Sequence, residues 1–155
     1  MNVEYNLPEK GAYPKHREKD DNRRRHAGYF ALYDWCWGAD PQWIYDLSDQ
    51  HRTYWFDHGH FLGGGAPTPS EWTCEAFAAY TNEETGFWSS PRGLSQGEID
   101  RLAGKVAGVT SADIISVLAR IPPDWPISNN ELEAVGSFLL ERAPAVADRI
   151  RKLAA

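Results

Sequence analysis

Hydrophobic positions first become periodic in segment 22–37, where Tyr29, Tyr33 and Trp37 follow one another at intervals of four residues. This spacing places the three aromatic rings on one face and is typical of an amphipathic helix. Gly38 follows directly, and glycine tolerates the left-handed conformation that often ends a helix. The pattern therefore predicts a helix over 22–37 with Gly38 at its C-terminal cap.

The periodicity changes after this helix. Segments 42–46 (QWIYD) and 52–57 (RTYWFD) are rich in aromatic and β-branched residues, and the mostly polar connection 47–51 separates them. Two such segments joined by a short polar turn predict a β-hairpin. The segment 63–69 is rich in glycine and proline and predicts a loop.

Helical patterns return in the second half of the chain, each preceded by a serine or threonine that is suited to an N-cap. Pro144 is expected to begin or kink a final helix that ends at Leu153. The fold class that follows is mainly α with one β-hairpin, that is α+β. The predicted caps are Ser70 for a helix over 71–80, Ser95 with Glu98 for 96–107, Thr110 with Asp113 for a helix that Pro122 and Pro123 end, and Ser128 with Glu131 for the next helix.

The chain divides into an N-terminal segment, 1–21, and a folded domain, 22–155. The first segment is charged, contains prolines and lacks periodicity, so it is expected to be an extended lead-in that is dispensable for folding. The whole chain has 155 residues, of which 42% are hydrophobic, and this is enough for one domain with its own core.

The composition of the chain bears on whether it binds nucleic acid or enters a membrane. The net charge of −6 gives no basic surface for nucleic acid, so no direct nucleic-acid binding is expected. No apolar segment approaches the roughly 20 residues that a transmembrane helix needs, so no membrane insertion is expected. Two cysteines and no recognisable signal peptide favour a reduced protein in the cytoplasm.

The candidate chemistry lies in WFDHGHFLGGG, residues 55–65, where a strand ends in Asp57, His58 and Gly59. Two interpretations compete. Asp57 can hold a magnesium ion for phosphoryl transfer, or a cluster of histidines and acidic residues can hold a transition metal directly. The side chains available for a zinc site are His51, Asp57, His58, His60 and Cys74, although no metal-binding motif of established spacing supports it.

The order of helix, turn with a carboxylate, hairpin and Asp-x-Gly resembles the C-lobe of a protein kinase. The segments YDWCWGADPQWIYDLSDQ, WFDHGHFLGGG, IPPDW and FLLER are similar to HipA-like kinases, more distant relatives of the phosphatidylinositol kinases. The resemblance covers about residues 22–153. It implies a protein-kinase-like C-lobe that uses ATP and Mg²⁺ to transfer a phosphoryl group to a protein Ser or Thr hydroxyl.

The resemblance assigns roles to four residues. Asp57 matches the metal-binding aspartate, and Asp40 occupies the position of the catalytic-loop aspartate. The loop asparagine is absent, since Tyr45 stands five positions after Asp40, but in a shortened loop Gln42 takes its place as a magnesium and nucleotide ligand. His58, inside the Asp-His-Gly triplet, is expected to contribute to cofactor binding.

A kinase also requires an N-lobe with a glycine-rich loop and a lysine on a strand. Residues 1–21 contain neither pattern. The resemblance therefore implies that another polypeptide, or a further part of a larger protein, supplies the N-lobe. The alternative is a catalytically inactive kinase-like module that binds or regulates a protein partner.

Overall fold

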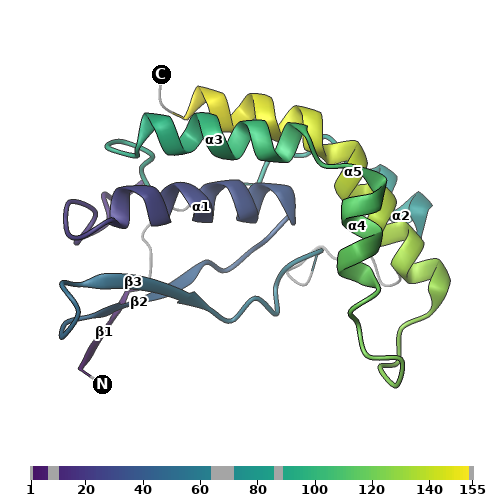
Figure 1. The fold of residues 1–155 in the computed structure, drawn as a ribbon, viewed down its shortest axis with the longest axis horizontal. Coiled ribbons are helices and arrows are strands. Elements are labelled where there is room, and N and C mark those ends of the chain that lie inside the picture. The colour runs from purple at the N-terminus through teal and green to yellow at the C-terminus, as the bar shows by residue number, and fades with distance from the viewer. Residues whose placement is uncertain (1, 7–10, 64–71, 86–88, 154–155) are drawn as a thin grey trace.

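A computed structural model describes residues 2–6, 11–63, 72–85 and 89–153, and the statements below concern these residues. They form an α+β domain with five helices and one three-stranded antiparallel sheet, which confirms the α+β class and adds one strand to the predicted hairpin. Helix α1 lies between the sheet on one side and α3 with the second half of α5 on the other (Figure 1). The elements are β1 (Val3–Asn6), α1 (Asn22–Trp35), β2 (Gln42–Asp46), β3 (Arg52–Phe56), α2 (Cys74–Ala78), α3 (Gln96–Ala107), α4 (Ser111–Leu118) and α5 (Asn129–Lys152).

The sheet contains the predicted hairpin and one further strand. Strands β2 and β3 pair in antiparallel register, with Gln42 opposite Phe56 and Trp43 opposite Trp55. Strand β1 pairs with the other edge of β2 and comes from the segment expected to be a lead-in. Alternation along β2 buries Trp43 and Tyr45 against α1, as the pleat of a half-buried strand requires.

Arg17, also in the N-terminal segment, is fully buried. Its guanidinium donates to the carbonyl oxygens of Ser90 and Arg92, at 2.6 and 2.8 Å, and to His26 Nδ1 at 3.1 Å. Burial lowers the pKa of Arg17 to about 10, which leaves it charged at neutral pH. The N-terminal segment is therefore part of the packed structure, and whether folding requires it stays a question for deletion.

The main core lies between α1, α3 and α5. Small side chains on α1 allow the helices to approach closely, and larger aliphatic side chains of α3 and α5 fill the space between them. A buried ion pair closes one end of this core, because Asp34 accepts from Arg142 at 3.3 Å and from Arg149 at 2.7 Å. The core residues are Ala27, Ala31, Ile99, Ala103, Val106, Ala143, Val146, Ala147 and Ile150.

Most predicted helix starts are confirmed. The side chains of Ser95, Thr110 and Ser128 accept from the backbone of α3, α4 and α5, and the last two form reciprocal capping boxes. Glu98 does not complete its predicted box, because its carboxylate pairs with Arg101. The helix expected over 71–80 is shorter: α2 is Cys74–Ala78, with Thr73 as its N-cap. Ser70, its predicted cap, and most of the predicted loop 63–69 lie outside the described residues.

Helix α5 is continuous through Pro144, so this proline does not begin a separate helix. The helix bends near its middle, and its two halves contact different elements (Figure 1). Proline cannot donate a backbone hydrogen bond and its ring crowds the preceding turn, which accounts for a bend at this position. The first half packs against α2 and α4, while the second half covers α3.

Candidate functional site

Asp40 and Asp57 lie at the open end of the hairpin. Gln42 and Phe56 are the last paired residues there, so Asp40 approaches β2 and Asp57 leaves β3 at the same end of the sheet. Both carboxylates belong to exposed residues. Both residues also adopt left-handed backbone conformations, with φ of 50° and 56°. Aspartate tolerates this conformation better than most residues, and its occurrence on both chains at the open end indicates a constrained backbone there.

Backbone hydrogen bonds join the segments that carry the two aspartates. The amide of Ala39 donates to the carbonyl of His60 at 2.9 Å, and the amide of Leu62 donates to the carbonyl of Cys36, also at 2.9 Å. These bonds hold the chain that follows Asp57 against the end of α1. We call the end of the hairpin that carries Asp40 and Asp57 the acidic end. Hydrogen bonds between two chain segments therefore hold its backbone in place.

Gln42 orients one of the two carboxylates. Its amide nitrogen donates to Asp40 Oδ2 at 2.8 Å, and its amide oxygen accepts from the Tyr5 hydroxyl of β1 at 2.6 Å. A magnesium ion would compete with Tyr5 for the amide oxygen that the sequence interpretation assigned to it. In this conformation the side chain of Gln42 links Tyr5 of β1 to the carboxylate of Asp40.

His58 lies within an aromatic cluster beside the same end. Its ring centroid is 4.8 Å from that of Phe61, 6.0 Å from Trp55 and 6.4 Å from Tyr33. The residue remains exposed, so its ring lies at the rim of the cluster. These contacts pack the segment that follows Asp57 against the aromatic cluster.

Tyr33 of α1 lies near this end of the hairpin. The residue is 5% exposed, and its hydroxyl oxygen is buried without a hydrogen bond to any described residue. Burial raises the pKa of Tyr33, the backbone amide of Gln42 acts in the opposite direction, and the charges of Asp40 and Asp57 raise it further. Both carboxylates are therefore within electrostatic range of one buried hydroxyl.

The residues considered for zinc do not come together. His51 lies at the turn of the hairpin, where its ring is 4.3 Å from that of His16, whereas His58 is at the opposite end of β3. Cys74 is exposed at the start of α2. Within the described ranges, no group of three or more His, Cys, Asp or Glu side chains is arranged to hold a metal ion. Magnesium needs fewer protein ligands, since it keeps waters and binds phosphates directly.

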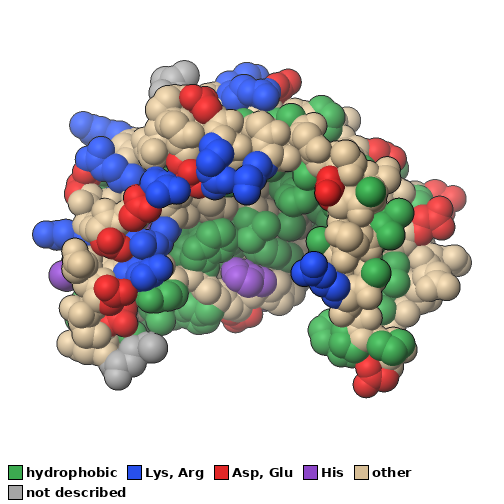
Figure 2. Space-filling model, in the orientation of Figure 1, with side chains coloured by type: hydrophobic (Ala, Val, Ile, Leu, Met, Phe, Trp, Pro, Cys, Tyr) green, Lys and Arg blue, Asp and Glu red, His purple; other side chains and the backbone are tan. Residues whose placement is uncertain are grey.

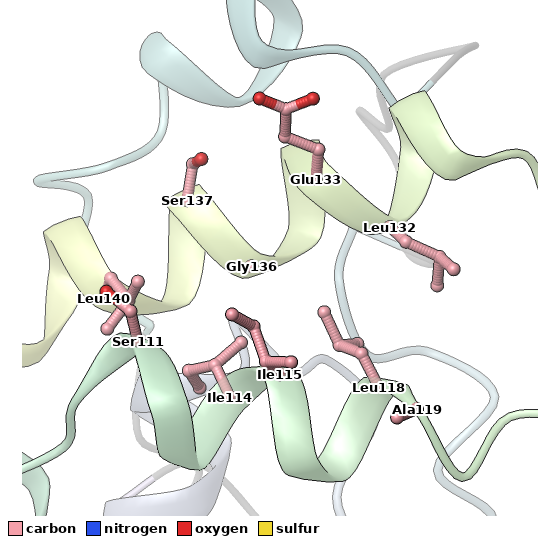
Figure 3. A pocket seen from close by; sticks show the side chains of 10 residues that line it. All are labelled: Ser111, Ile114, Ile115, Leu118, Ala119, Leu132, Glu133, Gly136, Ser137 and Leu140. Carbon is pink, nitrogen blue, oxygen red and sulfur yellow. The ribbon is translucent and has the colours of Figure 1, made fainter.

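Apolar grooves lie away from the acidic end. One, of about 450 Å³, separates α4 from α5 (Figure 3), where the side chains of Ile114, Ile115 and Leu118 point toward the turn that contains Gly136. Another, of about 500 Å³, lies where α1 meets α3 and Trp55. Figure 2 shows hydrophobic side chains gathered in a hollow between the body of the domain and α4. Ile115, Val117 and Trp125 are each at least 60% exposed.

Sequence reasoning missed two members of the acidic end, Tyr5 and Tyr33. The helical spacing places Tyr33 on the apolar face of its helix and gives no sign that it lies within electrostatic range of two carboxylates. Tyr5 lay in a segment without periodicity. A signal was present at Tyr33, because a tyrosine on a buried helix face usually needs a partner for its hydroxyl.

None of the described helices has the length and apolar character needed to cross a bilayer. Comparison with known proteins finds no family model, no curated protein and no solved structure that matches this chain. The similarity to HipA-like kinases therefore rests on the sequence motifs quoted above.

Proposed function

We propose that this domain acts as a kinase C-lobe that binds Mg²⁺ and ATP and takes part in phosphoryl transfer to a protein Ser or Thr hydroxyl. The observation that carries the proposal is that Asp40 and Asp57 lie at the same end of a hairpin. Phosphoryl transfer needs carboxylates at fixed positions for the metal and for the attacking hydroxyl. The backbone bonds from Ala39 and Leu62 supply that fixity.

Each residue at the acidic end is given its proposed role from its place beside the hairpin. Asp57 would hold the magnesium ion, which when bound neutralises charge on the phosphates. Asp40 would orient the acceptor hydroxyl, and Gln42 would keep the Asp40 carboxylate in place through its 2.8 Å hydrogen bond. His58 would contact the nucleotide from the rim of the aromatic cluster. A glycine-rich loop over the phosphates would come from an N-lobe on another chain.

Titration calorimetry with ATP and Mg²⁺ tests this proposal. We expect binding that requires the metal and that Asp57→Ala weakens at least about tenfold, since one charged ligand is lost. Asp49→Ala is the matched control, because Asp49 lies at the other end of the same hairpin beside Arg52. Its affinity should equal that of the unsubstituted chain.

Equal affinity of the Asp57→Ala and unsubstituted chains would contradict the assignment of Asp57. Absence of any magnesium-dependent binding, in protein shown to be folded, would contradict a site that is competent on this chain alone. The titration would then be repeated with a candidate N-lobe chain, such as a small β-rich protein encoded beside this one.

A catalytically inactive module that binds a protein partner is the second candidate. The exposed apolar side chains of α4 and the adjoining segment favour it, since exposed apolar groups that cluster mark interaction sites. Ile115→Glu would then abolish capture of a defined partner while leaving the magnesium–ATP titration unchanged. Loss of nucleotide binding in Asp57→Ala would instead favour the kinase function.

A further inference from the structure

The solvent-facing side of the sheet carries large apolar side chains. Helix α1 covers one face of the sheet, and none of the described helices lies on the other (Figure 1). Antiparallel sheets with one solvated face usually present polar side chains there. Here four large hydrophobic side chains are between 36% and 51% exposed, namely Val3 and Tyr5 of β1 and Tyr54 and Phe56 of β3. Because exposed apolar groups that cluster mark interaction sites, this face is a candidate docking surface.

The register of the sheet brings two of these rings together. Tyr5 is opposite Ile44 and Phe56 is opposite Gln42, so both side chains project from the same face as the outward positions of β2. The rings of Tyr5 and Phe56 meet across β2, with centroids 5.8 Å apart and planes inclined by 55°. We call these two rings the aromatic pair. Both residues are exposed, so the pair presents aromatic surface to solvent.

The acidic end places negative charge beside the aromatic pair. The Tyr5 hydroxyl donates to Gln42 Oε1 at 2.6 Å, and Gln42 Nε2 donates to Asp40 Oδ2 at 2.8 Å. Asp57 directly follows Phe56 in the chain. Neither aspartate forms an ion pair with a Lys, Arg or His among the described residues. Exposed aromatic rings and an exposed carboxylate therefore lie side by side, joined by hydrogen bonds.

The opposite end of the same face shows what this combination of groups binds. The guanidinium carbon of Arg52 lies over the Tyr54 ring, 5.7 Å from its centroid, and Arg52 Nη1 lies 3.5 Å from Asp49 Oδ2. The ring attracts the cation through its quadrupole, and the carboxylate pairs with the same cation. At the turn of the hairpin the chain thus supplies its own cation, whereas no described residue does so at the acidic end.

We infer that the aromatic pair binds a basic segment of a partner protein, with an arginine or lysine side chain over the rings and its charge directed at Asp40. Charge complementarity favours this occupant. The carboxylates would repel the phosphates of a nucleic acid, and a second copy of a chain with net charge −6 would bring like charges together. Arginine suits the site better than lysine, since its planar guanidinium stacks on a ring while it donates to a carboxylate. This inference goes beyond the proposed function and does not rest on it, because it requires neither Mg²⁺ nor nucleotide.

An NMR titration of the isotope-labelled chain, without metal or nucleotide, tests this inference. The probe is a short peptide of alternating glycine and arginine, and its glutamate counterpart is the charge control. Phe56→Leu keeps apolar bulk but removes the aromatic face, and Asp40→Asn removes the negative charge. We expect each change to weaken arginine-peptide binding about two- to fivefold, the effect of one exposed cation–π contact or ion pair, and the double variant to weaken it about tenfold.

Tyr54→Leu is the matched control, because Tyr54 lies on the same face and strand but its ring is already contacted by Arg52. Its affinity for the arginine peptide should equal that of the unsubstituted chain. The spectra also show whether each variant is folded. Equal effects of Phe56→Leu and Tyr54→Leu, or equal binding of the arginine and glutamate peptides, would overturn the inference.

Absence of arginine-peptide binding by the unsubstituted chain would overturn it as well. Sedimentation of the chain alone tests the competing occupant, since a dimer that Phe56→Leu dissociates would show that a second copy covers this face instead. Binding of a single-stranded oligonucleotide that Phe56→Leu abolishes would likewise replace the basic partner with stacked bases. The ATP titration of Asp57→Ala is a separate measurement, so this inference and the proposed function can fail independently.

Discussion

His26 shows how one buried side chain depends on its ionisation state. The ring is 1% exposed, stacks on Tyr29 and lies tilted against Trp43, and its Nδ1 accepts from Arg17. Burial lowers the pKa of His26 to about 3, with further contributions from the positive charges of Arg17 and Arg25. The folded protein therefore holds this imidazole neutral over a pH range where the unfolded chain binds a proton.

This difference predicts that stability falls with acidification below pH 6.5, the ordinary value for histidine. Because the folded-state pKa is depressed, the stabilisation is complete above pH 6.5 and is lost progressively toward pH 3. The slope from this one group approaches about 1.4 kcal/mol per pH unit. Urea unfolding between pH 6.5 and 5, above the range of most carboxyl groups, measures it.

His26→Ala should flatten the dependence on pH in that window, whatever it does to absolute stability. His58→Ala is the control, because His58 is exposed and its removal should preserve the slope of the unsubstituted chain. Identical slopes for all three proteins would show that His26 is not the responsible group.

At the scale of elements, the C-terminal end of α1 holds the chain segment that follows Asp57, through the backbone hydrogen bonds of Ala39 and Leu62. The helix stops at Trp35, and Trp37 rather than Gly38 takes the left-handed conformation, with φ of 47°. The amides of Trp37 and Gly38 donate back to Asp34 and Tyr33, which forms a Schellman motif. The predicted glycine cap is therefore wrong in its position. Gly38 is required by space, since a Cβ there would lie 2.6 Å from Phe61 and 2.8 Å from Tyr33.

Gly38→Ala is accordingly expected to destabilise the domain by about 1–3 kcal/mol, the usual cost of overpacking. It should also displace Phe61 and the chain after Asp57. Gly104→Ala is the matched control, because Gly104 lies within α3 and a Cβ there meets nothing within 4 Å. That change should stabilise by about 0.5–1 kcal/mol through helix propensity. Thermal or urea unfolding compares them, and equal effects of the two changes would contradict this account.

For the whole molecule, the N-terminal segment 1–21 contacts both the sheet and the segment that precedes α3, and so connects the two layers. Strand β1 covers the edge of β2, and the buried Arg17 ties this segment to the carbonyls of Ser90 and Arg92 before α3. Its removal would open the edge of the sheet and leave those carbonyls without donors. The segment thus connects parts of the chain that are more than seventy residues apart.

Deletion of residues 1–21 is expected to lower the free energy of unfolding by about 3 kcal/mol or more, because a buried network is lost. Deletion of residues 1–6 alone removes only β1 and should cost less, about 1–2 kcal/mol. Chemical unfolding of both proteins beside the complete chain measures the difference. A full-strength unfolding transition in the longer deletion would restore the interpretation of this segment as a lead-in.

Local chemistry explains which elements were predictable from sequence. The caps at Ser95, Thr110 and Ser128 act within four residues, and the hairpin follows from its own alternation, so each was visible without knowledge of the fold. Asp40 and Asp57 could be brought together because the hairpin that separates them is short. Helix α2 is shorter than the predicted helix over 71–80, and the sequence left open whether Pro144 begins or kinks the last helix, because packing against neighbouring helices outweighs local preference there.

The amino-acid sequence by itself determined the helices with strong caps, the hairpin, and the presence of two carboxylates at one end of that hairpin, since these depend on contacts between residues close in the chain. Only the tertiary structure decided that β1 completes the sheet, that Arg17 and Arg142 are buried, and that Tyr33 is buried within electrostatic range of Asp40 and Asp57. Those features arise from contacts between segments distant in sequence. Hydrophobic periodicity records which face of an element is buried, but it does not record which other element covers that face.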